Sequence, residues 1–573
     1  MFMQITIEVN NKKLRAEKGE TILSALNRNG INIPTLCRLE GLSPTGACRL
    51  CVVEVEGEAM LVTACSEPVK EWMKIRTHSP RVIRARKAIV ELLLSNHPDN
   101  CLYCDRNLAC ELQDIAYELN IRERRLSSDA MPVMLDQSSP AITRDLAKCI
   151  LCGRCVRICE EVMTINTLGF IGKGRGTHVG TTMDKDFNFS SCIHCGQCVN
   201  VCPTGAMHER YNVKEVQDYL DRDDMLKVVQ YSSLVAQSIA EELGMKYSTS
   251  FEEKLNEAFT RLGFDRVYST GFGSDVLVTE LSEQLAKNKS KKSGTTVFTS
   301  HCPAWVKFAE QTMEGVLDKL SGFKSPQQVT GAVIKALVPQ LEKVEPEQIY
   351  SVSVTACTAA KYDARRDDNT RKGISDIETV LTVREMIRLL RLYGIDMNML
   401  DGRHADEPFN LKSSCSLLTG LSGGLTESVI RVLSERHGIE LSPGEIRKLR
   451  TGGSFREITL GRGKLKYNFA IVNGLKGLSQ LEEMQKKVHY DLVEVMACDS
   501  GCVRGGGMDG SEAESIVKER VRSICKSSKA NVIKLPADNP SIRNYYDRWV
   551  PGNADLADRK ILMNSYSKKE VLL

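Results

Sequence analysis

The cysteines of this chain are grouped at the spacings that metal ligands take. The sequence of 573 residues contains 21 cysteines, and most of them stand two or three residues from the next one. Thiolates at such short spacing bind zinc or iron–sulfur clusters, whereas a disulfide framework distributes its cysteines differently. Sulfur-rich clusters need reduced thiols, so the pattern predicts an anaerobic or reducing interior, which we take to be the cytoplasm.

An internal repeat within residues 141–207 carries the strongest of these patterns. Each copy reads Cys-x2-Cys-x2-Cys-x3-Cys, and Pro203 follows the second copy. In such a run three thiolates wrap one 4Fe–4S cluster, and the fourth reaches across to the other cluster. Paired zinc sites are the alternative, but they rarely use this tripled spacing. We predict one cluster on Cys149, Cys152, Cys155 and Cys202, and a second cluster on Cys192, Cys195, Cys198 and Cys159.

Two further ligand sets precede the repeat. The first resembles the plant-type 2Fe–2S ferredoxin pattern with altered spacing, and a zinc ribbon is its alternative; it comprises Cys37, Cys48, Cys51 and Cys65. The second is predicted to hold a 4Fe–4S cluster and comprises His97, Cys101, Cys104 and Cys110. An imidazole in place of one thiolate removes negative charge and should raise the reduction potential of that cluster. A helix-capping role is the alternative for His97.

These sets together predict a relay for single electrons. A line of four clusters has one sensible purpose, which is to carry electrons between the protein surface and a buried centre. The sets by themselves do not say what chemistry that centre performs.

The elements that position the ligands can be inferred from hydrophobic periodicity. Residues 3–10 alternate like a short strand, and residues 21–29 and 81–96 follow helical periodicity. From about residue 210 onward cysteines become sparse, and alternating helical and strand patterns predict a large α/β unit. Residues 287–294 are predicted to form a basic surface loop. Residues 172–176 match a glycine-rich nucleotide motif only weakly and are also predicted to form a loop.

The overall composition excludes several classes of protein. The formal net charge of +4 is too small to indicate a nucleic-acid-binding protein. The longest apolar runs are far too short to span a bilayer, and the N-terminus has no apolar leader segment. We therefore predict a cytoplasmic protein with neither a nucleic-acid nor a membrane partner.

Four sparse cysteines in the C-terminal half identify the buried centre. Cys302 lies in FTSHCPAWVKFAE, Cys357 in VTACTAAKYDAR, and the last pair in EVMACDSGCVRGGG, at Cys498 and Cys502. These three segments resemble the signature loops of FeFe hydrogenases. The N-terminal sets match the large clostridial type of that family in order and spacing, and the segment KSPQQ also fits. Cys415 and Cys525 are left over, and we take both as ordinary thiols.

This resemblance implies an H-cluster in the C-terminal half. In the family, four such cysteines hold a 4Fe–4S cluster, and the last of them, here Cys502, also bridges to a diiron unit. That unit bears CO and cyanide ligands and a dithiolate bridge, and dedicated maturation proteins build it. The implied activity is reversible reduction of protons to H2, with electrons from a ferredoxin or flavodoxin. The implied cofactors are one 2Fe–2S cluster, three accessory 4Fe–4S clusters and the H-cluster.

The resemblance also implies a multidomain fold that combines α+β and α/β parts. We expect a 2Fe–2S ferredoxin-like β-grasp domain over residues 1–80. A small helical domain over residues 81–126 should hold the 4Fe–4S cluster that has one histidine and three cysteine ligands. A bacterial-type ferredoxin domain for two 4Fe–4S clusters should follow over residues 127–209. The remaining residues, 210–573, should form a large, two-lobed α/β H-cluster domain.

Several positions around the expected diiron unit depart from the family pattern. His301 stands where the family has a proton-donating cysteine, and Ala360 stands where it has a lysine that holds a cyanide. Lys361 comes one residue too late to replace that lysine. The residues expected to surround the diiron unit are Ser232, Ser233, Gln327, Thr355, Ala360 and Met496.

The proton route of the family is also interrupted. Its two glutamate positions hold Leu281 and Gln284, its arginine position holds Asn288, and only Ser321 is retained. Glu280 and Glu283 lie one residue away, which on a helix turns a side chain by about 100°.

We take His301, Ser321 and Cys502 as the catalytic candidates. Imidazole can shuttle protons near neutral pH, although a packing or hydrogen-bonding replacement is the alternative for His301. We expect a hydrogenase with altered rate or bias. An H2-responsive redox sensor and an electron-transfer protein without turnover are the alternatives.

Overall fold

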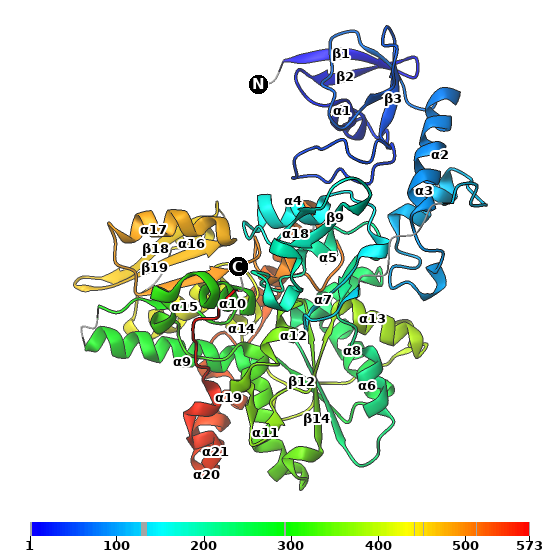
Figure 1. Ribbon diagram of the computed structural model, residues 1–573. Coiled ribbons are helices and arrows are strands. Elements are labelled where there is room, and N and C mark those ends of the chain that lie inside the picture. Colours follow the sequence, from blue (N-terminus) through cyan, green and yellow to red (C-terminus); the bar gives the residue numbers. More distant parts are fainter. Residues whose placement is uncertain are drawn as a thin grey trace.

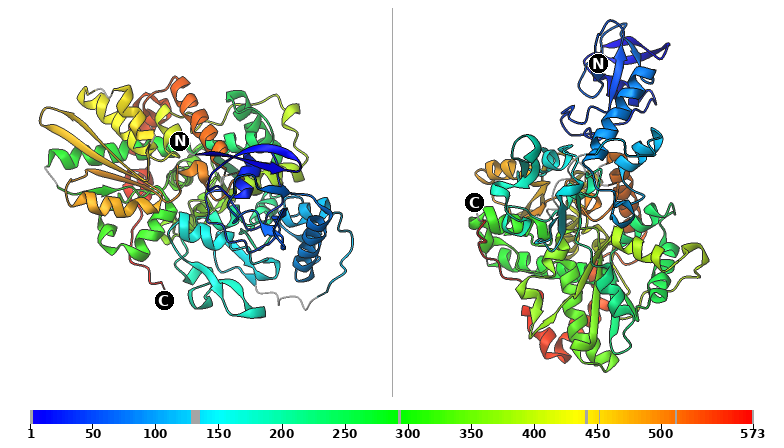
Figure 2. Two further views of the ribbon diagram at one scale, coloured as in Figure 1. Left: turned by 90° about the horizontal axis from the view of Figure 1, so that it is seen from above. Right: turned by 45° about the vertical axis from the view of Figure 1, so that its right-hand side comes forward.

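A small N-terminal domain stands apart from a larger body in the computed structural model (Figures 1 and 2). The structure describes residues 3–127, 135–291, 294–439, 442–450, 452–510 and 513–571. The body is two-lobed, and the cluster-binding segments lie between it and the N-terminal domain. The multidomain architecture of α+β and α/β parts that the sequence predicts is confirmed.

The N-terminal domain is a five-stranded sheet, in the order β2-β1-β5-β3-β4, with one helix packed on it. Its elements are β1 (Gln4–Val9), β2 (Lys12–Glu17), α1 (Ile22–Arg28), β3 (Val52–Val55), β4 (Val62–Thr63) and β5 (Lys74–Arg76). The helix begins after Thr21, whose hydroxyl accepts a hydrogen bond from the Ser24 amide at 3.2 Å. The predicted strand at 3–10 and helix at 21–29 are therefore both present.

Helix α2 (Pro80–Ser95) connects this domain to the body, and it lies where the sequence predicts a helix. Ser79 caps its first turn, and Pro80 occupies the first helical position. Proline is favourable there because a backbone N–H at this position has no partner within the helix, so its absence from proline costs nothing. A short 3₁₀ turn at Cys101–Tyr103 and α3 (Glu111–Glu118) follow. Val90, Leu112 and Ile115 form a small core in this segment.

The ferredoxin-like segment has two related halves. Its elements are β6 (Leu135–Asp136), β7 (Ile142–Asp145), α4 (Arg154–Arg157), β8 (Leu168–Ile171), β9 (His178–Thr181), α5 (Gln197–Asn200) and β10 (Met207–Glu209). Helices α4 and α5 follow corresponding left-handed glycines, Gly153 and Gly196, one in each copy of the repeat. Residues 172–176 lie in the turn between β8 and β9, so the loop predicted there is confirmed.

The first lobe of the body contains a parallel sheet in the order β12-β11-β14-β17. Its strands are β11 (Leu226–Tyr231), β12 (Arg266–Ser269), β14 (Ile349–Thr355) and β17 (Thr379–Thr382), and a small hairpin joins β15 (Thr370–Arg371) to β16 (Ile374–Ser375). The helices of this part are α6 (Val213–Leu220), α7 (Ser233–Glu242), α8 (Thr249–Leu262), α11 (Pro326–Glu342), α12 (Ala359–Asp363) and α13 (Val383–Leu392).

The second lobe contains a sheet in the order β13-β20-β19-β18, in which only the β18–β19 pair is antiparallel. Its strands are β13 (Val297–Phe298), β18 (Phe455–Arg462), β19 (Leu465–Asn473) and β20 (Leu492–Met496). The helices around it and at the C-terminus are α9 (Gly271–Ser290), α10 (Pro303–Thr312), α14 (Ser414–Leu418), α15 (Gly424–His437), α16 (Pro443–Arg450), α17 (Leu478–Gln485), α18 (Glu514–Ala530), α19 (Pro540–Asn544), α20 (Val550–Gly552) and α21 (Ala554–Ala557).

Residues 287–294 do not form the surface loop that the sequence predicts over this whole range. Residues 287–290 form the last turn of α9 rather than part of a surface loop, while residues 292–293 lie outside the described residues. Lys287 and Lys289 favour the helical state because cations near a helix C-terminus complement its dipole. Lys289 also forms an ion pair with Asp491, at 2.8 Å between Nζ and Oδ1.

Four segments that the sequence singles out follow the carboxyl ends of parallel strands. Ser232 follows β11, Cys302 follows β13, Cys357 follows β14 and Cys498 follows β20. Ligand sites in open α/β sheets form at such strand ends, so two sheets here share one site. No helix among the described residues is long and apolar enough to cross a membrane.

Candidate active site and cluster sites

A cavity of about 150 Å³ lies where these strand ends meet. The four C-terminal cysteines all line it: Cys302, Cys357, Cys498 and Cys502. The predicted neighbours of the diiron unit also line it: Ser232, Ser233, Gln327, Thr355, Ala360 and Met496. Because they come from distant parts of the chain, only the packing of the two lobes brings these residues together.

The donor set of this cavity fits a cationic metal cluster. Burial raises the pKa of the Cys357 thiol to about 12, and it also raises the pKa of the Cys302 thiol. Buried thiolates without compensating positive charge would be unfavourable, whereas binding to metal keeps a thiol deprotonated. Four thiols converging on one cavity are therefore suited to a 4Fe–4S cluster.

His301 also faces this cavity, and its geometry points to a bound group. The residue is only 7% exposed, and neither ring nitrogen has a hydrogen-bond partner among the described residues. Burial lowers the pKa of His301 to about 4, so the ring is neutral near pH 7. A neutral ring has one N–H donor and one acceptor nitrogen, and leaving both unmade in a buried site is costly. A polar or metal-bound ligand in the cavity would satisfy this requirement.

The loop after β14 does not supply a lysine to the cavity. Lys361 is turned away, because its ammonium donates to the Asn212 side chain at 2.8 Å and pairs with Glu385 at 2.7 Å. Ala360 lies on the cavity wall, and its carbonyl accepts a hydrogen bond from the Gln327 amide at 3.2 Å. The lysine position of the family pattern is therefore left apolar here.

A different lysine reaches the cavity, and the sequence reasoning missed it. Lys412 lies on the cavity wall and donates to the Ser233 hydroxyl at 2.7 Å between Nζ and Oγ. Nothing in the sequence marks this residue, because it lies outside all three signature loops. Its role depends on how the segment before α14 packs against the start of α7.

The expected proton route is blocked by apolar packing. The Ser321 hydroxyl is hydrogen-bonded to the Ser300 hydroxyl, with 2.5 Å between the two Oγ atoms. Ser300 directly precedes His301 in the chain. Leu281, which stands at one of the two glutamate positions of the family's route, is fully buried in an apolar cluster with Val278 and Leu285. Aliphatic side chains cannot carry protons, so the route ends there.

The neighbouring glutamates do not replace this route. Glu280 accepts hydrogen bonds from the Tyr546 hydroxyl at 2.9 Å and from Arg559 at 3.1 Å. Glu283 pairs with Arg436 on the surface, at 2.7 Å. Both carboxylates are therefore directed to partners outside the expected path.

The repeat cysteines surround two small cavities in the ferredoxin-like segment. One cavity is lined by Cys149, Cys152, Cys155 and Cys202. The other is lined by Cys159, Cys192, Cys195 and Cys198. Within the part of the chain that the structure describes, no group of three His, Cys, Asp or Glu side chains could hold a single metal ion. Ligands spaced around a small volume suit a cluster better than one zinc ion.

The two N-terminal ligand sets differ in how exposed their cysteines are to solvent. In the first set the thiols contact one another, with Cys37 against Cys48 and Cys65. In the second set Cys101 is exposed and Cys110 is buried, and the buried Nδ1 of His97 has no hydrogen-bond partner within the described ranges. Binding of clusters by both sets stays a prediction.

Two arginines link both N-terminal sets to the repeat, an arrangement that we call the fork. Arg157 donates to the carbonyl oxygens of Cys37 at 2.5 Å and Cys152 at 3.3 Å, so it joins the first set to the repeat. Arg154, on the same short helix, forms a bidentate pair with Glu111 at 2.6 and 2.9 Å, next to Cys110 of the second set. Both N-terminal sets therefore converge on the Cys149 set.

The second repeat set directly contacts the active-site cavity. Cys195 lines both its own cavity and the large one. Gly506 allows this approach, because a Cβ atom there would lie 2.2 Å from the Cys195 carbonyl oxygen. The Gln197 amide donates to the Arg504 carbonyl at 2.7 Å and holds the two loops together.

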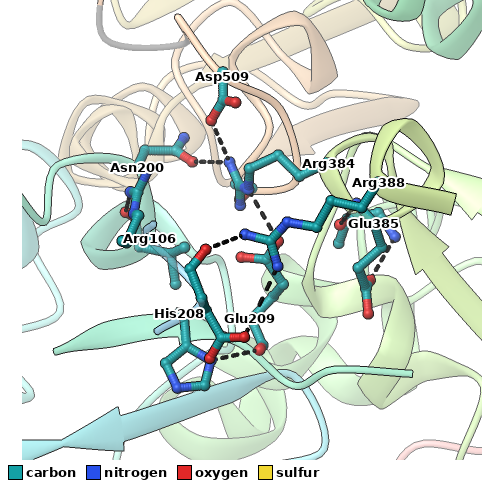
Figure 3. Close-up of polar contacts among 12 residues, drawn as sticks. Arg106, Asn200, His208, Glu209, Arg384, Glu385, Arg388 and Asp509 are labelled. Atoms are coloured by element: carbon teal, nitrogen blue, oxygen red, sulfur yellow. Dashed lines mark hydrogen bonds and ion pairs between the residues drawn. The ribbon is translucent and has the colours of Figure 1, made fainter. Parts of the chain in front are cut away.

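A network of buried ion pairs and hydrogen bonds holds the ferredoxin-like segment against the body (Figure 3). Arg384 of α13 pairs with Glu209 at 3.1 Å, donates to Asn200 at 3.0 Å and pairs with Asp509 at 3.3 Å. Arg388, one turn further along α13, donates to the Asp105 carbonyl at 2.5 Å. One helix thus orients both the segment of the second N-terminal set and the ferredoxin-like segment toward the active site.

Comparison with known families agrees with this architecture. Residues 226–506 match the iron only hydrogenase large subunit, C-terminal domain, and residues 3–80 match a 2Fe-2S iron-sulfur cluster binding domain. Residues 86–125 match the NADH-ubiquinone oxidoreductase-G iron-sulfur binding region. Residues 139–208 match the ferredoxin-like domain of NADH-quinone oxidoreductase subunit 3.

Relatives that match along nearly the whole chain are hydrogenases by name. The NADP-reducing hydrogenase subunit HndD of Solidesulfovibrio fructosivorans is 33% identical and covers 99% of this chain and 100% of its own length. Iron hydrogenase 1 of Clostridium pasteurianum is 31% identical and covers 91% of each chain. An apo FeFe hydrogenase structure from Chlamydomonas reinhardtii is 25% identical, with a TM-score of 0.53, and covers 63% of this chain and 99% of its own. The chain is thus an oxidoreductase with 2Fe–2S, 4Fe–4S and H-cluster domains, and it belongs to the FeFe hydrogenase family.

Proposed function

We propose that this protein catalyses the reversible reduction of two protons by two electrons to H2. The observation that carries the proposal is the cavity that four thiols line together with His301, whose ring has no hydrogen-bond partner among the described residues. All four cysteines would hold a 4Fe–4S cluster: Cys302, Cys357, Cys498 and Cys502. Cys502 would also connect this cluster to the diiron unit. When bound, that unit supplies the site at which protons and electrons combine.

The side chains of this chain then have distinct roles. The apolar part of the wall, including Ala360 and Met496, excludes water from the cavity. Gln327 is held in place because its amide donates to the Ala360 carbonyl and its carbonyl accepts from the Ser353 hydroxyl at 3.0 Å. His301 is neutral at pH 7, so it can accept a proton at one nitrogen while it donates from the other.

We further propose that electrons enter at the N-terminal ligand sets and pass to the repeat. They then reach the active-site cavity at Cys195. A ferredoxin or flavodoxin is one fitting electron partner, because such proteins exchange single electrons. A nucleotide-oxidising partner subunit is the second candidate. It is favoured by the relative named as a subunit of an NADP-reducing hydrogenase and by the two domains related to NADH-quinone oxidoreductase. A reducing cytoplasm suits the thiolate ligands.

The test is anaerobic maturation with the proteins that build the diiron unit, followed by iron analysis, infrared spectroscopy and H2 assays. We expect one 2Fe–2S cluster, four 4Fe–4S clusters including that of the H-cluster, and infrared bands of CO and cyanide. We also expect H2 evolution with a reduced dye. Iron limited to the accessory sets, with neither infrared bands nor H2, would exclude catalysis and favour an electron-transfer role. Bands with H2-dependent redox changes but no turnover would favour the sensor.

A further inference from the structure

A second cavity lies directly behind the active-site wall. It has a volume of about 1030 Å³ and lies between α7, α8 and α18. Lys412 and Leu417 line both this cavity and the active-site cavity. The charged groups that face it are Glu241, Lys246, Glu252, Lys412, Glu519, Arg522 and Lys526.

A continuous chain of hydrogen bonds crosses the wall between the two cavities. The Tyr247 hydroxyl, on the outer side, donates to the Glu252 carboxylate at 2.7 Å. The other Glu252 oxygen accepts from the Lys412 ammonium, which in turn donates to the Ser233 hydroxyl at 2.7 Å. Ser233 lines the active-site cavity. Ionisable groups therefore connect the active site with the outer cavity, whereas the family's route is closed at Leu281.

We propose that Glu252, Lys412 and Ser233 form the proton path of this protein, from the outer cavity into the active-site cavity. This inference rests on the proposed hydrogenase activity. It assigns a role to Ser233, which is one of the residues expected to surround the diiron unit and which lines the active-site cavity. The path also supplies what the interrupted route lacks, which is a titratable group connected to the outside.

Each proton transfer along this path restores the side chains. A proton from water in the outer cavity binds to the Glu252 carboxylate. Lys412 then gives one of its protons to the Ser233 oxygen, while the Ser233 hydroxyl releases its own proton into the active-site cavity. The neutral Lys412 amine recovers a proton from Glu252. One proton has crossed, Glu252 is again a carboxylate, and the electrons arrive separately through the clusters.

The electrostatics of the pair suit such a relay. Burial by itself would raise the pKa of Glu252, but the charge and hydrogen bond of Lys412 and the hydrogen bond from Tyr247 lower it. The carboxylate is therefore ionised at rest and ready to accept a proton. Burial raises the pKa of the phenol of Tyr247 above its ordinary value, so this group stays protonated and acts as a donor to Glu252.

Substitution of Lys412 by arginine separates a relay from a structural ion pair. Lys412→Arg keeps a cation beside Glu252, but a guanidinium does not deprotonate in proteins. We expect Lys412→Arg, Lys412→Met and Ser233→Ala each to lower dye-driven H2 evolution by about 100-fold, since positioned proton transfer contributes about 100- to 10,000-fold. Lys246→Met is the matched control, because Lys246 faces the same outer cavity but lies outside the chain of hydrogen bonds. It should behave like the wild type.

A readout without turnover completes the experiment. After a light-triggered electron pulse, the CO bands of matured protein should shift to those of the protonated state more slowly in Lys412→Arg than in Lys246→Met. Wild-type protein without CO bands and without H2 would contradict the proposed function itself. Wild-type turnover that is matched by Lys412→Arg would overturn the proton path alone. If Lys412→Met lacks the CO bands, this variant no longer holds the diiron unit and does not test proton transfer. Lys412→Arg and Ser233→Ala then test the proton path, because they alter the cavity wall less.

Discussion

His301 combines deep burial with a ring that has no hydrogen-bond partner in the part of the chain that the structure describes. Its two nitrogens therefore depend on whatever the cavity holds, and its neutral state makes it a proton acceptor rather than a resident cation. The proposed path delivers protons to the same cavity from the side of Ser233. His301 would then distribute protons within the cavity instead of ending the family's route.

The first prediction at this scale concerns His301 itself. His301→Ala should lower H2 turnover by about 10- to 100-fold, because general acid–base groups contribute about that much or more. The content of clusters should change little, since the four thiol ligands remain. The measurement is H2 production and uptake from pH 5 to 9, together with iron analysis. Turnover equal to that of the wild type throughout this range would show that His301 has no proton role.

Restoring the family's residues provides the matched comparison. His301→Cys alone should not recover the full rate, because Leu281 and Gln284 still interrupt the path. The triple variant with His301→Cys, Leu281→Glu and Gln284→Glu should recover more. If His301→Cys alone reached the rate of the triple variant, the block at Leu281 would not limit turnover.

At the scale of elements, α9 holds the active-site lobes through one buried carboxylate. Asp275 accepts hydrogen bonds from the Ser413 amide at 3.0 Å and from the Asn539 amide group at 3.0 Å. These contacts tie the segments before α14 and α19 to the middle of the molecule. The same packing directs Leu281, further along α9, into the apolar core.

Asp275 should also make stability depend on pH. Burial raises its pKa from 3.8 to about 6, so the folded state favours the neutral acid. The stabilisation is therefore present at low pH and is lost as the pH rises through 6, by about 3 kcal/mol in full and about 1 kcal/mol between pH 5 and 8. Asp275→Asn should remove this dependence. Unfolding midpoints from pH 5 to 8 would check it, and parallel curves for both proteins would contradict it.

At the scale of the whole molecule, the segments before residue 210 form the proposed electron path and are attached to one large body. Arg154 and Arg157 form hydrogen bonds with the segments of the two N-terminal sets. Arg384 and Arg388 hold the ferredoxin-like segment and the segment of the second set against the body. Figure 2 shows how far the N-terminal domain projects from the rest.

Deletions should distinguish the path from the catalytic body. A chain without residues 1–210 should still react with artificial dyes but react poorly with a protein donor, because the clusters that receive its electrons are gone. It loses the Glu209 partner of the buried Arg384, so a lower unfolding temperature is also expected. The matched deletion of residues 1–78 removes one branch only and keeps the Ser79 cap of α2. Equal donor-linked rates for the 1–210 deletion and the full chain would contradict the relay.

The sequence by itself determined the family, and it predicted the ligand sets and the domain order, because thiolate spacing and the loops around Cys302, Cys357 and Cys498 are local patterns. It also identified the departures at His301 and Ala360 by position alone. The short elements at 3–10, 21–29 and 81–96 follow from periodicity and capping, which are local as well.

Only the tertiary structure decided how these parts are connected. The fork at Arg154 and Arg157, and the role of Arg384, depend on contacts between residues far apart in the chain, which no spacing encodes. Lys412 reaches the active site only because its segment packs against the start of α7. The extra turn of α9 at 287–290 likewise depends on a distant partner, Asp491. Local patterns specify ligands, whereas the direction in which buried charges point is set by the packing of whole elements.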